Sequence, residues 1–275
     1  MSRNFELLQN IGKEEEYFQP ERLLTETAVA PPVTQPDQQQ DPLPSLFSTE
    51  PAAVVAPPAE PLQFAMESSQ LAELAKLVQR LFLLPGGEYN RTVVFSSSDS
   101  GNGCSWICAR VGELLASQIT GSVCLVDANL QSPTLHEQFG VPNHHGLSDA
   151  LRQSGSIRGY VSQLSRRNLA LISCGSDANE AQSLLNSDRM RMRLSELRSE
   201  FEYVLVDCPA MSISNEAISL GAAADGVVLV LKANATRKDR ARSAVRDLQA
   251  AKIKVLGAVL NQRTYPIPEK IYTKL

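Results

Sequence analysis

The sequence has no long apolar run, no excess of basic charge and no apolar signal-peptide core in its first 20 residues. No apolar stretch among the 275 residues approaches the ~18 residues that a helix needs to cross a membrane. The first 20 residues, "MSRNFELLQNIGKEEEYFQP", have no apolar core of the kind that signal peptides carry. The 26 Lys and Arg are scattered and are outnumbered by 30 Asp and Glu, which disfavours nucleic-acid binding. We therefore expect a cytoplasmic protein with no membrane span and no nucleic-acid partner.

Cysteine is scarce and unpatterned. The five cysteines are odd in number and form no C-x-x-C pair, so neither a disulfide framework nor a zinc site is predicted. We expect most of them to be small buried thiols. They are Cys104, Cys108, Cys124, Cys174 and Cys208.

Residues 1–20 carry apolar side chains at roughly helical spacing, followed by "KEEE". This pattern suits either a frayed helical tail or an amphipathic peptide that docks on a partner. The side chains concerned are Phe5, Leu7, Leu8 and Ile11.

The next segment, residues 21–66, is rich in proline and glutamine. Nine of the sixteen prolines fall between residues 31 and 61, and no hydrophobic period is present. Such a composition buries too little apolar surface to fold, so we expect a disordered, partly polyproline linker. Residues 263–275 are expected to form a C-terminal tail.

Residues 67–262 have the pattern of a folded α/β domain. From Ser68, "SSQLAELAKLVQRLFLL" places Leu71, Leu74, Leu77, Val78 and Leu81 on one helical face. Six apolar, β-branched runs then alternate with helical stretches, and they cover residues 92–97, 122–127, 169–173, 203–207, 226–233 and 254–261. Runs that are apolar on both faces predict a doubly wound, mainly parallel sheet with helices on both faces. The loops that follow the strands then lie along one edge of this sheet.

The stretch "SSDSGNGCSW", residues 97–106, follows the first strand and precedes a helix expected to begin near Cys104. Gly101 and Gly103 let backbone N–H groups turn inward, and Ser105 offers a hydroxyl beside the positive end of the helix. These features suit an anion cradle. The alternative is a plain strand-to-helix turn, because a G-x-x-x-x-G-K-[ST] phosphate loop would carry lysine at position 104.

Two aspartates end later strands of the predicted sheet, Asp127 in "VCLVD" and Asp207 in "YVLVD". An acid in such a place can hold a magnesium-bound water or orient a nucleophile. Each alone could equally be a helix cap or turn former. Both acids together, in order after the glycine loop, favour a site.

This order of motifs resembles the cytoplasmic domain of bacterial tyrosine kinases, which belong with the Min- and Par-type P-loop ATPases and serve surface-polysaccharide assembly and export. The resemblance runs from about Arg91 to Gln262 and is most specific in "DANLQSPTLHEQFG" with "GLSDAL". It implies a P-loop NTPase-like fold and ATP with magnesium as cofactors. It also implies a membrane-anchored polysaccharide co-polymerase or chain-length regulator as partner, which would hold the protein at the inner face of the membrane. Self-association into a homo-oligomer is a further option.

The same resemblance assigns roles to individual residues. Asp127 stands in the Walker A′ motif and Asp207 in Walker B as the catalytic acids, and both would bind magnesium together with Ser105. Asn261 stands where the family lines the adenine pocket. The Walker A loop would comprise Gly101, Asn102, Gly103, Cys104, Ser105 and Trp106.

The loop departs from the family pattern. Cys104 replaces the phosphate-binding lysine, Ser98 the first glycine, and Trp106 a small hydroxyl residue. The tail has only Tyr265 and Tyr272, where active kinases carry a tyrosine-rich cluster. A lysine ammonium about 4 Å from a phosphate oxygen contributes roughly 4 kcal/mol at an effective dielectric near 20. Its loss predicts that binding of ATP and magnesium is weak or lost.

Three functions stay open at this point. The favoured one is a kinase-like, non-catalytic or weakly catalytic regulatory partner in exopolysaccharide or capsule export. The second is an active tyrosine autokinase in which Arg110, Lys232 or a neighbouring subunit's arginine replaces the lysine. The third is a dinucleotide-binding oxidoreductase with "GNGCSW" as its glycine fingerprint and Asp127 on the ribose, although Trp106 would block close helix-to-sheet packing. ATP binding with tyrosine phosphorylation, or NAD binding, would discriminate among them.

Overall fold

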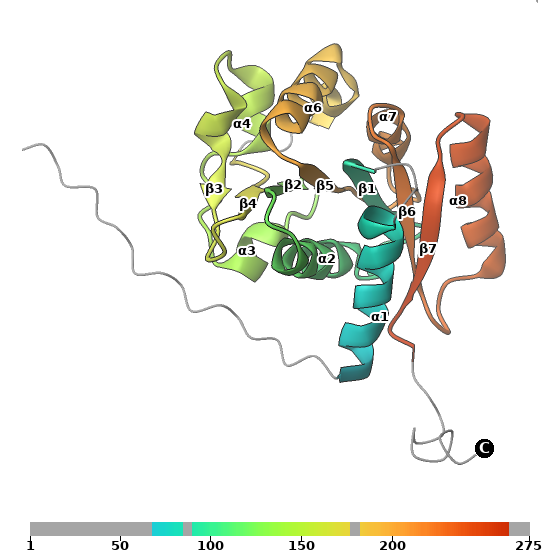
Figure 1. Ribbon diagram of the computed structural model, residues 1–275. Helices are drawn as coiled ribbons and strands as arrows, with labels where there is room; N and C mark the ends of the chain where they lie inside the picture. Colours follow the sequence, from blue (N-terminus) through green and yellow to red (C-terminus); the bar gives the residue numbers. More distant parts are fainter. Residues whose placement is uncertain (1–67, 85–89, 177–181, 264–275) are drawn as a thin grey trace, which may run out of the picture. The chain divides into compact units, whose positions relative to one another are not determined.

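The structure, a computed structural model, describes residues 68–84, 90–176 and 182–263 (Figure 1). These residues form a seven-stranded sheet in the order β3-β4-β2-β5-β1-β6-β7, parallel except between β3 and β4. The strands are β1 Thr92–Ser97, β2 Val123–Asp127, β3 Ser162–Gln163, β4 Leu169–Ile172, β5 Tyr203–Asp207, β6 Gly226–Lys232 and β7 Val255–Asn261.

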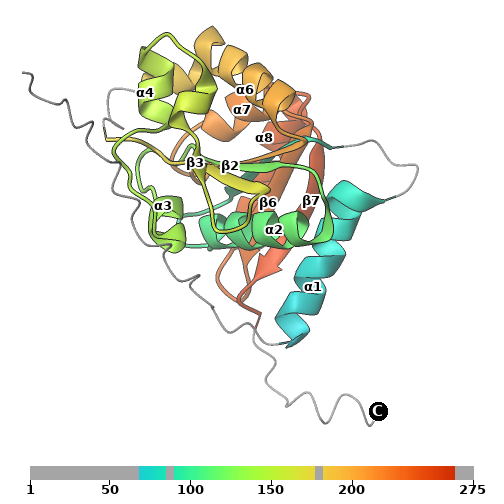
Figure 2. The same cartoon turned by 60° about the vertical axis from the view of Figure 1, so that its left-hand side comes forward.

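Helices cover both faces of the sheet (Figures 1 and 2). One face carries α1 Ser68–Val78 with the π-helical turn Gln79–Leu83, α2 Cys104–Gln118 and α3 Leu135–Phe139. The other face carries α4 Leu147–Arg152, α6 Asp188–Glu200, α7 Glu216–Ala222 and α8 Lys238–Ala250. Two 3-10 turns, Ile157–Tyr160 and Gln182–Asn186, complete the described elements. The predicted doubly wound, mainly parallel sheet is confirmed.

The core strands follow the predicted pattern closely. Every residue of β1, β2, β4 and β5 is buried, because these strands pack against helices on both sides. The six predicted strands agree with the structure to within one residue at each end. The strand β3 was not predicted. It consists of two polar residues, which pair antiparallel with Ala170 and Leu171, and two residues are too few to give a hydrophobic period.

The leading helix differs in one detail from its prediction. Leu74, Val78 and Leu81 are buried as expected, but Leu71 is 48% exposed. None of residues 68–71, the first turn of α1, is buried. The apolar period therefore begins one turn before the helix reaches the core.

The "GLSDAL" motif joins the start of α4 to the end of β4. The N–H groups of Leu147 and Ser148 donate to the carbonyls of Ser173 and Cys174, each at 2.8 Å. These bonds leave no space for a side chain at Gly146, where a Cβ atom would lie 2.2 Å from the Ser173 carbonyl oxygen. The motif holds the loop after β4 in place beside the end of β2, where Asp127 lies.

Gly146→Ala is therefore expected to destabilise the fold by about 1–3 kcal/mol, because backbone atoms must move to admit the methyl group. Gly159→Ala is the matched control, since a Cβ there meets no atom within 4 Å. Urea unfolding followed by circular dichroism measures both. Equal stability of the two variants would contradict the steric argument.

Candidate functional site

The glycine-rich stretch forms a tight loop between β1 and α2, and α2 begins at Cys104 as predicted. Gly101 and Gly103 adopt left-handed backbone conformations with φ of 76° and 81°. Glycine is the residue that adopts this conformation without strain. The loop thus has the local geometry expected of an anion cradle at a helix N-terminus.

Side-chain hydrogen bonds tie the loop to the ends of β6 and β7. The buried Asn102 donates through Nδ2 to the Ser98 hydroxyl at 3.2 Å and to the Val230 carbonyl at 3.3 Å. Asn261 donates through its own Nδ2 to the Asn102 carbonyl at 2.9 Å. A Cβ atom at Gly103 would lie 2.4 Å from that Nδ2, so a side chain there would displace the Asn261 amide. The structure thus places Asn261 directly on the loop backbone.

The two strand-end acids are neighbours in the sheet, where Asp127 on β2 pairs in register with Asp207 on β5. Both side chains are fully buried. Asp127 accepts hydrogen bonds from the backbone N–H groups of Asn129 at 3.2 Å, Thr134 at 3.2 Å and Leu135 at 3.1 Å. Neither carboxyl oxygen of Asp207 has a hydrogen-bond partner in the described part of the chain. Asp207 is therefore a buried acid whose hydrogen-bonding capacity is not met by the described residues.

Burial raises the pKa of both carboxyls. The charge of Asp127 raises the pKa of Asp207 further. The Ser105 hydroxyl and the Cys104 thiol lie close enough to lower the pKa of Asp207, but they form no hydrogen bond with its oxygens. The acid pair therefore favours a protonated state at neutral pH unless a cation joins it.

Cys104, which the motif resemblance aligns with the phosphate-binding lysine, is a buried neutral thiol. Burial, and next the charge of Asp207, raise the pKa of this thiol well above its ordinary value. Burial likewise raises the pKa of Cys108 and Cys208. All five cysteines are free and buried, as expected. Cys104 consequently brings neither a positive nor a negative charge to the loop.

The remaining residues of the predicted site lie at the start of α2. Ser105 and Trp106 are both half-buried, and Trp106 packs on the hydrophobic cluster of the α1–α2 face. Of the cations considered from the sequence, Arg110 is buried in an ion pair with Glu113 (Nη1 to Oε2, 2.6 Å), and its guanidinium lies 5.8 Å from the centre of the Phe139 ring. Arg110 is thus held toward α3 and not toward the loop.

Lys232 ends β6, and its N–H donates to the Thr236 hydroxyl at 2.9 Å. A cation that sequence reasoning missed is Arg240 of α8, whose Nη1 lies 3.9 Å from Oδ1 of Asp99 in the loop. The only sequence signal for it is the basic start of α8, "RKDRAR".

The acid pair and Ser105 fit magnesium chemically, since this ion prefers oxygen ligands and takes the rest of its shell from water and nucleotide phosphates. Among the residues that the structure describes, no group of three or more His, Cys, Asp and Glu side chains is gathered to hold a metal ion. The two unpartnered oxygens of Asp207 are the donors that such a cation would satisfy.

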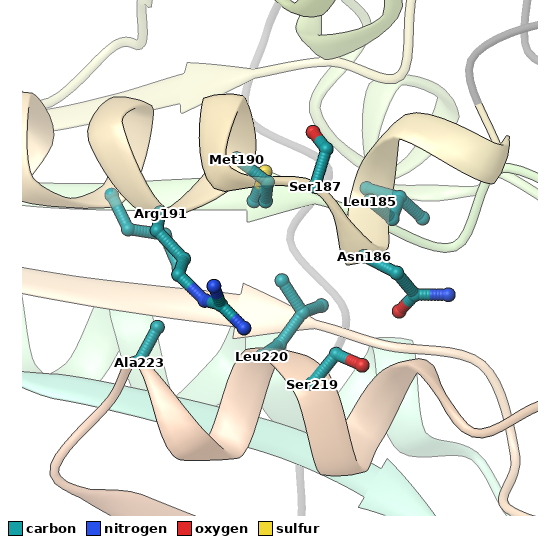
Figure 3. A pocket seen from close by; sticks show the side chains of 9 residues that line it. Leu185, Asn186, Ser187, Met190, Arg191, Ser219, Leu220 and Ala223 are labelled. Atoms are coloured by element: carbon teal, nitrogen blue, oxygen red, sulfur yellow. The ribbon is translucent and has the colours of Figure 1, made fainter.

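A separate narrow groove lies between α6 and α7 (Figure 3). It has no space for a water molecule and gathers none of the residues of the predicted site. Its lining residues are Leu185, Asn186, Ser187, Met190, Arg191, Leu194, Ser219, Leu220 and Ala223.

A mainly parallel sheet with a glycine loop after β1 and acids at the ends of β2 and β5 is the architecture of a P-loop NTPase-like protein. Residues 91–252 match the model of the family described as "Cellulose biosynthesis protein BcsQ". The chain belongs to this family, among the bacterial tyrosine kinases and polysaccharide-biosynthesis P-loop ATPases. The resemblance inferred from the motifs is thereby confirmed.

Two relatives and one solved structure illustrate this family. The chain is 31% identical over 171 residues to the tyrosine-protein kinase YwqD of Bacillus subtilis (strain 168), covering 62% of this chain and 72% of that protein. It is 27% identical over 183 residues to the succinoglycan biosynthesis transport protein ExoP of Rhizobium meliloti (strain 1021), covering 66% of this chain but only 23% of ExoP. The kinase domain of the Escherichia coli tyrosine kinase ETK superposes with a TM-score of 0.59 at 21% identity, over 65% of this chain and 71% of that domain. At this identity the structural match shows a shared fold.

No helix in residues 68–84, 90–176 and 182–263 is long and apolar enough to cross a membrane. The segments expected to be a docking peptide and a linker, residues 1–20 and 21–66, lie outside the described residues, as does the expected tail 263–275 except for its first residue. Tyr265 and Tyr272 lie there as well.

Proposed function

We propose that this protein is a kinase-like regulatory partner in exopolysaccharide or capsule biosynthesis and export, with no catalytic activity or a weak one. The observation that carries the proposal is the neutral, buried Cys104 thiol at the lysine position, next to an acid pair that is in place. Phosphoryl transfer depends almost entirely on positioning and charge neutralisation. A loop without the lysine ammonium loses much of the charge neutralisation, while the fold keeps the positioning.

The chain's own residues define what nucleotide binding remains. The backbone N–H groups around Gly101 and Gly103, with the N-terminus of α2, would bind phosphate oxygens. Magnesium would be held by Ser105, Asp127 and Asp207, and it would neutralise phosphate charge. Asn102 and Asn261 would keep the loop in shape through the bond between them.

A second candidate function is an active tyrosine autokinase of the same pathway. It is favoured by the paired Asp127 and Asp207 and by the presence of Arg240 beside the loop. The dinucleotide-binding alternative finds no support in the relatives reported above, whose names describe kinases and polysaccharide biosynthesis.

The partner we infer is a membrane-anchored polysaccharide co-polymerase or chain-length regulator, which would keep the protein at the inner face of the membrane. The name of ExoP, a biosynthesis transport protein that matches this chain over 23% of its own length, supports this inference. The amphipathic pattern of residues 1–20 suits a docking peptide on such a partner.

Transfer of labelled γ-phosphate from magnesium-ATP tests the catalytic part of the proposal. We expect phosphate incorporation and ATP hydrolysis by the unmodified protein to be no more than slightly above those of Asp127→Ala, with YwqD as the active reference. Efficient turnover that disappears in Asp127→Ala would overturn the proposal in favour of the active kinase.

A further inference from the structure

The first turn of α8 lies at the same edge of the sheet as the glycine loop. Strand β6 pairs in parallel with β1, with Ser97 opposite Val230, and α8 follows β6 after residues 233–237. Asn102 ties the loop to this same strand through the Val230 carbonyl. The ion pair between Arg240 and Asp99 therefore joins two elements that the sheet already holds together.

The glycine loop, residues 97–106, carries no basic side chain of its own. Asp99 is the one acid in residues 97–106, and that stretch contains no Lys or Arg. An acid here repels phosphate, and the neutral thiol of Cys104 does not offset it. In the described part of the chain, the basic side chain that forms an ion pair with the loop is Arg240 of α8.

The ion pair between Arg240 and Asp99 is weak enough for a phosphate to replace Asp99 as the partner of Arg240. Its closest atoms are 3.9 Å apart, and the side chains are 62% and 33% exposed. Such exposed pairs contribute about 0–1 kcal/mol. A nucleotide phosphate carries more charge than one carboxylate, and a guanidinium can bind two of its oxygens at once. A phosphate on the loop amides would draw Arg240 away from Asp99.

We propose that Arg240 is the phosphate-binding cation of this site and takes over part of the role of the lysine that Cys104 replaces, with Asp99 holding it beside the loop. This inference rests on the proposed nucleotide site. It differs from the sequence alternatives because Arg110 is paired with Glu113 and packed on Phe139. It also needs no neighbouring subunit.

Calorimetric titration of the full chain with magnesium-ATP, and separately with inorganic phosphate, tests the proposal. Arg240→Gln is expected to weaken ATP binding at least about tenfold, which corresponds to roughly 1.4 kcal/mol. The matched control is Arg246→Gln, an exposed arginine on the same helix about 9 Å further along its axis. The control should change the affinity less than twofold, and thermal unfolding should confirm that both variants are folded.

Asp99→Asn supplies the second arm. As a single substitution it should strengthen ATP binding severalfold. In the Arg240→Gln background it should strengthen ATP binding by a smaller factor, because the two side chains are coupled. Equal weakening by Arg240→Gln and Arg246→Gln would show a general charge effect and overturn the proposal. So would the absence of any ATP binding by the unmodified protein at millimolar concentrations.

The outcomes separate this inference from the proposed function. Binding that depends on Arg240 without turnover supports both. Efficient turnover that is lost in Arg240→Gln would retain Arg240 as the phosphate ligand and overturn the regulatory, weakly catalytic assignment. Absence of ATP binding overturns the role of Arg240 but leaves a non-catalytic partner intact.

Discussion

The Cys104→Lys variant should bind magnesium-ATP at least about tenfold more tightly than the unmodified protein, because an ammonium near the phosphates contributes several kcal/mol before desolvation. The position starts α2 at the end of the glycine loop, and Trp106 packs on the α1–α2 cluster. Titration with a fluorescent ATP analogue measures the gain.

Cys104→Met controls for the loss of the thiol, since it lengthens the side chain without adding charge and should not improve binding. If hydrolysis appears in Cys104→Lys, Asp207→Ala should abolish it in that background. A folded Cys104→Lys variant with unchanged affinity would show that the missing ammonium is not the limiting defect. The acid Asp99 would then be the next group to neutralise.

Asp207→Asn should stabilise the fold at pH 8 by about 1–3 kcal/mol, because a neutral amide avoids the cost of burying a carboxylate charge beside Asp127. For a domain of this size the melting temperature would rise by about 2–12 °C. Within the residues that the structure describes, both Asp207 oxygens are buried without a hydrogen bond, and they face the charge of Asp127. A stabilising substitution at this position would indicate a site retained for ligand binding and not for stability.

The stability that Asp207→Asn adds should increase with pH. The folded-state pKa of Asp207 is raised above its unfolded value by burial and by Asp127. The unmodified protein therefore loses stability as the pH rises from the unfolded pKa through the folded one. The advantage of Asp207→Asn should be small at pH 5 and largest above pH 8, in thermal unfolding without magnesium or nucleotide.

Asp127→Asn is the matched comparison, because Asp127 accepts three backbone hydrogen bonds that an amide group satisfies only in part. Its stabilising effect should be smaller than that of Asp207→Asn. A lower melting temperature for Asp207→Asn at pH 8 would contradict the account of an unpartnered acid.

Much of the fold could be predicted from local patterns. The six parallel strands were predictable because strands buried on both faces are continuous apolar runs, and the start of α2 was predictable from glycines followed by a helical period. The antiparallel edge strand β3 and the exposure of Leu71 were not, since both depend on where an element ends relative to its neighbours.

The sequence by itself determined where the strands and motifs lie along the chain, the acids at the strand ends and the absence of lysine from the loop, all of which are local properties of short segments. Only the tertiary structure decided that Asp127 lies beside Asp207, that Asn261 donates to the Asn102 carbonyl and that Arg240 meets Asp99. Each of these contacts joins residues far apart in the chain. They depend on strand order and side-chain direction, which the packing of the whole domain sets and no local pattern encodes.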